Sequence, residues 1–161
     1  MTVIVVMGVA GSGKTTVGRA LAAALGVEYA EADEFHPQAN IDKMSAGTPL
    51  TDADRAPWLA AIADWIRERE HGVVTSSALK RRYRDVLRSG GDVWFAHLGG
   101  DRETLAARMR ARTDHFMPVS LLDSQLADLE PLQPDEPGRV FDIARPPEDL
   151  VEAIRAATVD M

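Results

Sequence analysis

The sequence predicts an α/β fold in which a five-stranded parallel sheet lies between two layers of helices. The main observation is the order of segments, because strands and helices alternate along nearly the whole chain. The run VIVVM at residues 3–7 is rich in β-branched residues, which is typical of a strand covered on both faces. With 161 residues, 45% of them hydrophobic, the chain is long enough to bury a core as one domain.

A helix is expected after each strand, and several helix ends carry recognisable signals. Gly26 and Gly90 are expected to end two helices, and Asp101 is the expected N-cap of a third. Pro57 and Pro147 lie near the first turns of two others. The expected strands are residues 3–7, 27–32, 72–78, 93–98 and 139–144, and the expected helices are residues 15–25, 57–70, 80–90, 101–112 and 147–159.

Two segments interrupt this alternation, residues 37–70 and residues 113–137. The first is irregular up to Arg55 and rich in Pro, Gly, Asn and Asp, and the second is polar. Long irregular segments in compact α/β proteins usually form binding loops or lids. We therefore expect a single domain, residues 1–161, with a substrate-binding insertion at residues 37–70 and a lid at residues 113–137.

The composition excludes several kinds of protein and site. The chain has no cysteine, which excludes disulfides, thiolate catalysis and cysteine-ligated metals. Its net charge of −7 argues against a nucleic-acid partner. The first apolar run is too short for a signal peptide, and no stretch approaches the roughly 20 apolar residues of a membrane span. We expect a cytoplasmic protein that binds neither nucleic acid nor membrane.

Residues 8–15 read GVAGSGKT, which matches the G-x-x-x-x-G-K-T pattern of a phosphate-binding loop. Glycines let the backbone N–H groups surround an anion at a helix N-terminus. Lys14 adds a positive charge for the β- and γ-phosphates, and the Thr15 hydroxyl can bind Mg²⁺. A glycine-rich turn without a ligand is the alternative, which the full pattern between a strand and a helix disfavours. The residues expected to contact ATP are Gly8, Ala10, Gly11, Ser12, Gly13, Lys14, Thr15 and Thr16.

This phosphate loop, residues 8–15, does not by itself separate a kinase from a GTPase or a motor. The chain has no guanine-reading NKxD string, and its third strand ends VVTSSA rather than in an acidic residue. Both observations favour a small-molecule kinase. Asp33 follows the second strand, so it is expected at the carboxyl edge of the sheet, where a carboxylate can take the proton of a substrate hydroxyl. A role in capping the next turn is the alternative for Asp33.

Three further blocks of the sequence resemble the gluconate kinases (gluconokinases): DEFHPQANIDKMSAGTPLTDADRAPWL, SSALKRRYRDVLR and HFMPVSLLDSQLADLEPL. With the phosphate loop, they follow one another over nearly the whole chain. The resemblance implies a P-loop kinase fold related to shikimate kinases, with strand order 2-3-1-4-5. It also implies that the protein phosphorylates D-gluconate on its 6-hydroxyl with ATP. Glu31 departs from the family pattern, in which Asp is frequent, while Asp33 matches it.

Gluconate has a carboxylate at one end and the reacting hydroxyl at the other, so its site needs cations. Lys80 and Arg84 are four residues apart and can share a helix face. By spacing alone, a solvated basic face is as good an explanation as a binding site. The resemblance favours Lys80 and Arg84 as ligands of the substrate carboxylate. It also implies a substrate contact for Arg55, with an ion pair to Asp52 or Asp54 as the alternative. The remaining candidates for substrate binding are His36, His115 and Gln125. The alternative for His36 is a solvated side chain, which is usual for a lone histidine in an exposed turn.

Arg108 and Arg112 lie on one face of the helix that leads into the predicted lid. Lid arginines in kinases of this architecture stabilise the charge of the transferring phosphoryl group, so the expected catalytic residues are Lys14, Asp33, Arg108 and Arg112. Arg145, after the fifth strand, is expected to stack on the adenine. Mg²⁺ is expected to bind Thr15 and water, with help from Asp33.

Two alternatives to a gluconate kinase remain at this point. One is a kinase for another small hydroxy acid such as shikimate, and the other is a non-catalytic sensor that binds ATP. The family is commonly dimeric, so we also expect a homodimer.

Overall fold

The structure is a computed structural model that describes residues 2–111 and 119–159. Its elements follow the alternating order that the sequence predicts. The strands are β1 (Val3–Met7), β2 (Tyr29–Glu31), β3 (Gly72–Thr75), β4 (Val93–Gly99) and β5 (Gly138–Asp142); the helices are α1 (Lys14–Leu25), the 3-10 helix η1 (Ala32–Phe35), α2 (Gln38–Ser45), α3 (Asp52–Arg67), α4 (Arg81–Arg88), α5 (Arg102–Ala111), α6 (Val119–Asp128) and α7 (Pro147–Thr158).

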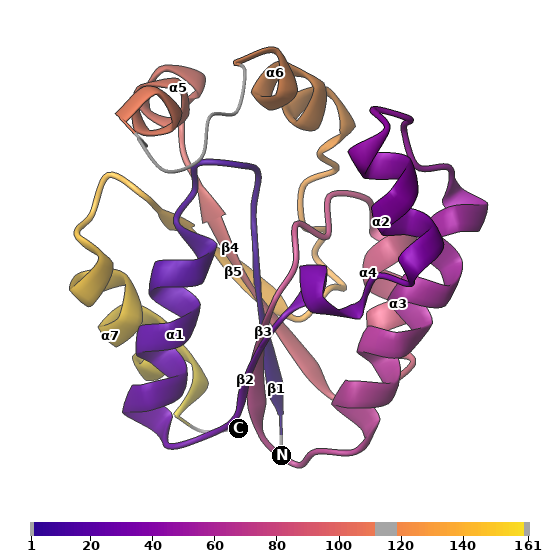
Figure 1. The fold of residues 1–161 in the computed structure, drawn as a ribbon. Helices are drawn as coiled ribbons and strands as arrows, with labels where there is room; N and C mark the ends of the chain where they lie inside the picture. The colour runs from indigo at the N-terminus through magenta and orange to yellow at the C-terminus, as the bar shows by residue number, and fades with distance from the viewer. Residues whose placement is uncertain (1, 112–118, 160–161) are drawn as a thin grey trace.

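The five strands form one parallel sheet in the order β2-β3-β1-β4-β5, which confirms the predicted fold class and strand order. Figure 1 shows α1 and α7 on one face of the sheet and α3 and α4 on the other. No helix in the described ranges has both the length and the apolar character needed to cross a bilayer.

Strand β1 lies at the centre of the sheet and divides its side chains between two cores. Ile4 and Val6 pack in the core that includes Leu21 of α1, whereas Val5 packs with Ile62 of α3 on the opposite face. All five residues of β1 are buried, as expected for a strand with helices on both sides. The middle of the sheet is therefore a packed base for the loops that leave the carboxyl ends of its strands.

Helix α2 lies in a segment that the sequence analysis expected to be irregular, so that expectation was wrong. Asn40 of α2 is buried, and its side-chain amide donates to the carbonyl oxygen of Asp54 at 2.9 Å. Lys43 of the same helix pairs with the Asp54 carboxylate, also at 2.9 Å. These tertiary contacts hold a short helix of weak intrinsic propensity against the start of α3.

Helix α3 begins at Asp52, ahead of the expected start near Pro57, which lies inside the helix. Thr51 and Asp54 form a reciprocal capping box: the Asp54 N–H donates to the Thr51 hydroxyl at 3.1 Å, and the Thr51 N–H donates to the Asp54 carboxylate at 2.9 Å. The T-x-x-D pattern was present in the sequence and was overlooked in favour of the proline.

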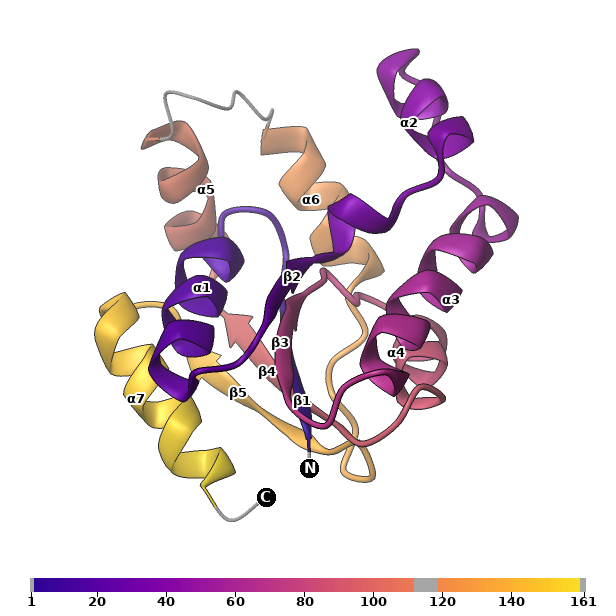
Figure 2. The same cartoon turned by 60° about the horizontal axis from the view of Figure 1, so that its bottom comes forward.

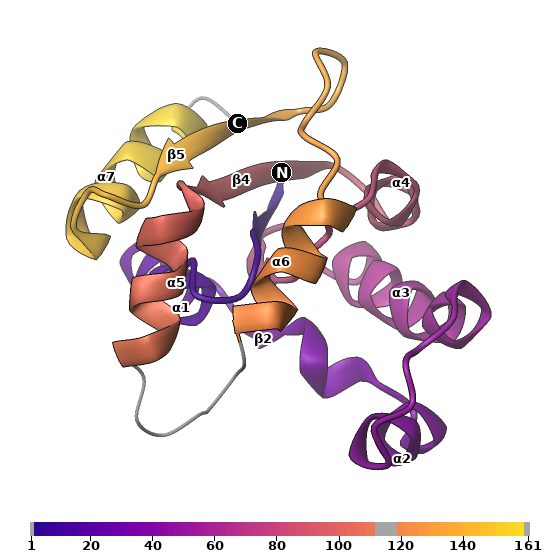
Figure 3. The same cartoon turned by 90° about the horizontal axis from the view of Figure 1, so that it is seen from above.

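Helices α5 and α6 lie over the carboxyl edge of the sheet, on either side of the phosphate loop (Figures 2 and 3). Asp101 caps α5 as predicted, because its carboxylate accepts the Thr104 N–H at 2.7 Å. Helix α6 was not expected within the predicted lid. Its Leu122 is fully buried in the core that also contains Leu105 of α5, which explains why this polar segment contains an ordered helix.

Candidate functional site

The phosphate loop connects β1 to α1 and takes a shape that depends on glycine. Gly11 and Gly13 have φ angles of 84° and 87°, in the left-handed region. A Cβ on Gly11 would lie 2.9 Å from Met109 Cγ and 3.0 Å from the Leu105 carbonyl oxygen, so a side chain would collide with α5. Gly13 is the N-cap of α1, and the loop therefore ends where helix N–H groups lack intrahelical acceptors. This geometry suits a bound phosphate.

Lys14 bends its side chain back across the loop. Its ammonium group donates to the carbonyl oxygens of Gly8 at 2.9 Å and Val9 at 3.2 Å. The ammonium thus lies over the loop that would hold the phosphates. Ser12 is buried within the same loop, and its hydroxyl has no hydrogen-bond partner among the described residues.

A small cavity of about 70 Å³ joins the phosphate loop to the end of β2, and it is lined by Lys14, Thr15, Glu31, Ala32, Asp33, Thr75 and Ser76. The structure thus brings Asp33 beside Lys14 and Thr15, at the carboxyl edge where the sequence predicts it. The buried Ser76 hydroxyl has no partner among the described residues. Hydroxyl and carboxylate oxygens are the ligands that Mg²⁺ prefers, so these side chains fit the ion.

His36 lies within electrostatic range of both the predicted base, Asp33, and the predicted substrate arginine, Arg55. Its ring stacks on Trp58 with centroids 4.3 Å apart, and the Trp58 indole donates to the Ala32 carbonyl at 2.6 Å. Burial lowers the pKa of His36; nearby Asp33 opposes this shift and nearby Arg55 adds to it. The imidazole is therefore packed against Trp58, and its lowered pKa favours the neutral ring.

Charged residues of α3 and α4 form what we call the cation cluster, which comprises Arg55, Lys80 and Arg82 around the carboxylate of Asp52. A guanidinium nitrogen of Arg82 lies 2.7 Å from the Asp52 carboxylate, and one of Arg55 lies 3.5 Å from the same carboxylate. Tyr83 donates its hydroxyl to Asp52 at 2.8 Å and accepts a hydrogen bond from Arg55 at 3.3 Å. The Tyr83 hydroxyl, followed by Arg82 and Lys80, lowers the pKa of Asp52. The ion pair considered as an alternative for Arg55 is present, with Asp52 and not with Asp54.

Arg84 does not belong to this cluster, and the expectation that it binds the substrate carboxylate is wrong. Its side chain is 0% exposed. Nε and Nη2 donate to the Glu136 carboxylate at 2.6 and 2.9 Å, and Nη1 donates to the Ala78 carbonyl at 2.9 Å. The spacing argument failed because Lys80 precedes the helix as its extended N-cap, so Lys80 and Arg84 do not share a helix face.

Arg108 of α5 and Gln125 of α6, on the side of the predicted lid, both reach the phosphate loop. Arg108 Nη1 lies 3.8 Å from the position a Cβ on Gly13 would take, and Nη2 donates to the carbonyl of Ile143. Gln125 accepts the backbone N–H of Ala10 at 2.6 Å. Arg145 is exposed in the segment after β5, two residues after Ile143, whose carbonyl accepts the hydrogen bond from Arg108. The predicted residues Arg112 and His115 lie outside the described residues.

Sequence reasoning overlooked three residues that the geometry brings to the site: Ser76, Arg82 and Tyr83. Ser76 was noted only because it is not acidic. Arg82 was not among the predicted site residues. The sequence signal for Tyr83 was an aromatic residue inside the charged run KRRYR. Its ring orients two guanidinium groups of the cluster, because the guanidinium carbons of Arg55 and Arg82 lie 5.6 and 5.2 Å from the ring centroid.

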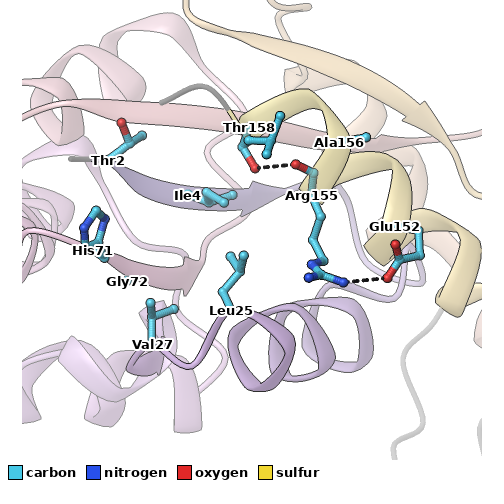
Figure 4. A pocket seen from close by; sticks show the side chains of 11 residues that line it. Thr2, Ile4, Leu25, Val27, His71, Gly72, Glu152, Arg155, Ala156 and Thr158 are labelled. Atoms are coloured by element: carbon cyan, nitrogen blue, oxygen red, sulfur yellow. Dashed lines mark hydrogen bonds and ion pairs between the residues drawn. The ribbon is translucent and has the colours of Figure 1, made fainter.

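A larger cavity lies away from these residues, at the opposite edge of the sheet (Figure 4). It measures about 610 Å³ and is bounded by the start of β1, the end of α1 and the last turns of α7. Ile4, Leu25 and Arg155 are among the residues that line it. Of the predicted site residues that the structure describes, none lines this cavity.

Comparisons with known proteins agree with this geometry. The shikimate kinase family matches residues 10–132 of the chain. The gluconokinase of Gluconobacter oxydans is 54% identical over 159 residues, covering 94% of this chain and 89% of that protein. The thermosensitive gluconokinase of Escherichia coli is 46% identical over 94% of this chain and 87% of its own length. The crystal structure of a gluconokinase from Sinorhizobium meliloti superposes with a TM-score of 0.90 at 48% identity, covering 99% of this chain and 92% of that one.

Proposed function

This chain belongs to the gluconokinase family and is an ATP-dependent gluconate kinase, and we propose that it transfers the γ-phosphoryl group of ATP to the 6-hydroxyl of D-gluconate. The family predicted from the sequence is confirmed. The relatives do not favour a kinase for another acid or a non-catalytic sensor.

One observation carries the choice of acceptor and hydroxyl. Asp33 lies in the cavity beside Lys14 and Thr15, whereas Arg55 of the cation cluster does not line that cavity and lies within electrostatic range of His36, whose ring stacks on Trp58. A linear acid can therefore present its terminal hydroxyl to Asp33 and its carboxylate to the cations. A neutral sugar would leave those cations without an anionic ligand.

In the proposed reaction, Asp33 accepts the proton of the 6-hydroxyl as the hydroxyl oxygen bonds to the γ-phosphorus. The bond from that phosphorus to the β–γ bridging oxygen breaks, and ADP leaves. The phosphate-loop N–H groups and Lys14 hold the donor phosphates, and Arg108 offsets the charge on the transferring group. Mg²⁺, when bound beside Thr15 with Ser76 and Asp33 in reach, would neutralise phosphate charge.

A coupled assay of ADP release tests this proposal. We expect ADP release to depend on gluconate and to be lost in Lys14→Ala, because that variant lacks the cation over the phosphate loop. A panel with shikimate and other aldonates should give much lower kcat/KM values. ADP release that is independent of gluconate, or stronger with another acid, would overturn the proposal.

We further propose that the protein works in the cytoplasm as a homodimer, as the family resemblance implies. Sedimentation equilibrium of the purified chain measures its mass in solution, and a monomer at micromolar concentration would contradict this.

A further inference from the structure

Asp52 occupies the kind of site that a substrate carboxylate requires. Its two oxygens accept the Tyr83 hydroxyl at 2.8 Å and contact Arg82 at 2.7 Å, and Arg55 approaches at 3.5 Å. Lys80 adds a further positive charge. Three cations thus surround one internal carboxylate, and the cluster retains a net positive charge when Asp52 is in place.

The cluster is open to a ligand and lies at the correct end of the proposed substrate site. The side chains of Asp52 and Arg82 are 55% and 54% exposed, so the contact between them can be broken from solvent. The charge of Arg55 lowers the pKa of His36, and the charge of Asp33 in the cavity raises it. Groups at both ends of the proposed substrate site, the cluster and the cavity at the phosphate loop, therefore lie within electrostatic range of one ring.

We propose that Asp52 is an internal stand-in for the substrate carboxylate, which the incoming acid displaces from Arg82 and Tyr83. This inference rests on the proposed function and assigns Arg82 and Tyr83 to the carboxylate subsite alongside Arg55. A ligand with a carboxylate replaces every contact that Asp52 gives up, whereas a neutral polyol breaks those contacts without restoring them. Asp52 therefore disfavours neutral acceptors, which cannot replace the contacts that they break.

A double-mutant cycle on Asp52 and Arg82 tests the displacement. In Asp52→Asn, the KM for gluconate should fall about two- to fivefold, the range expected for an exposed ion pair that no longer has to be broken. Arg82→Gln alone should change that KM little, because Arg82 exchanges one carboxylate for another. In the Asp52→Asn background, Arg82→Gln should raise the KM by about the same two- to fivefold, because nothing competes for Arg82 there.

The controls separate displacement from general charge effects and from misfolding. Asp64 and Arg67 form a similar exposed pair near the other end of α3, so Asp64→Asn and Arg67→Gln should leave the gluconate KM unchanged. The KM for ATP should remain unchanged in all variants, which shows that they are folded. As a second measurement, D-glucitol should inhibit Asp52→Asn more strongly than the wild type, because a neutral polyol no longer has to break the contacts of Asp52.

The outcomes distinguish this inference from the function on which it rests. Equal effects of Arg82→Gln in both backgrounds, or a rise in the gluconate KM of Asp52→Asn, would overturn the stand-in role while leaving a gluconate kinase. Absence of gluconate-dependent ADP release from the wild type would instead overturn the proposed function, and the inference with it.

Discussion

The side-chain carbonyl of Gln125 accepts the backbone N–H of Ala10 at 2.6 Å, so helix α6 is bonded directly to the phosphate loop. Ala10 lies between the first two glycines of that loop, where its backbone helps to set the shape of the anion site. The contact joins residues that are 115 positions apart and explains how a helix of the lid segment can influence phosphate binding.

We expect Gln125→Ala to lower kcat/KM for ATP by up to about tenfold, because a neutral hydrogen bond of this kind is worth about 1 kcal/mol. Steady-state kinetics at saturating gluconate measure the change. Ser124→Ala, at an exposed position of the same helix, is the matched control and should behave as the wild type. A Gln125→Ala enzyme with unchanged ATP kinetics would show that the bond does not shape the loop.

Asp33→Asn is expected to lower kcat by at least about a hundredfold, because an amide cannot take the proton of the acceptor hydroxyl. The KM for ATP should change little, since the phosphate-loop contacts remain. Glu34→Gln changes a neighbouring exposed carboxylate of η1 and should retain near-normal turnover. If Asp33→Asn kept normal turnover, the role assigned to Asp33 would be wrong.

Arg108→Gln is expected to lower kcat by at least about tenfold while leaving the gluconate KM nearly unchanged, because its charge acts on the phosphoryl group in transfer. Arg110→Gln is the matched control on α5, at an exposed position. Equal losses in the two variants would mean that the effect comes from the helix surface and not from the position of Arg108 beside Gly13.

Glu136→Ala is expected to lower the free energy of unfolding by about 3 kcal/mol or more, because it leaves the buried guanidinium of Arg84 without its carboxylate. Both side chains are 0% exposed, so water cannot replace the lost contact. Urea unfolding measures the change. Asp135→Ala removes the neighbouring exposed partner of Arg81 and should cost much less. Similar losses in both variants would contradict the structural role of the buried pair.

The same pair makes stability depend on pH. Burial raises the pKa of Glu136, but it is outweighed by the hydrogen bonds from Arg84 and the Gln133 N–H together with the charges of Arg84 and Arg81. The pKa therefore lies below its ordinary value of 4.5. A carboxyl group with a lowered folded-state pKa stabilises the fold above its unfolded pKa and loses this contribution as the pH falls through the folded value. The stability difference between wild type and Glu136→Gln should therefore be full above about pH 5 and shrink below it. Urea unfolding at neutral and acidic pH measures both differences, and equal values would contradict the lowered pKa.

The arrangement of the sheet and the phosphate loop could be predicted because both depend on local patterns. The β-branched run of β1, the G-x-x-x-x-G-K-T motif and the Asp101 cap each specify their own structure from neighbouring residues. Asp33 was placed correctly because the carboxyl ends of parallel strands meet at one edge of the sheet.

The cations of the site could not be assigned in this way, because their directions depend on contacts distant in sequence. Arg84 faces inward because Glu136, from the segment after α6, supplies a buried carboxylate 52 positions away. Arg82 faces the site because Asp52 begins α3 and lies within its reach. Spacing within KRRYR shows which residues share a helix face only when the first helical residue is known. The helix was expected to begin at Lys80, but it begins at Arg81.

The position of the new phosphate on the product tests the central claim most directly. ¹³C and ³¹P NMR of the product formed from ATP and D-gluconate by the wild-type protein should show phosphorus coupling at C6 and its neighbour C5 only, because Asp33 and the cation cluster hold opposite ends of the acid. Phosphate on any other carbon, or no phosphorylated gluconate at all, would contradict the account.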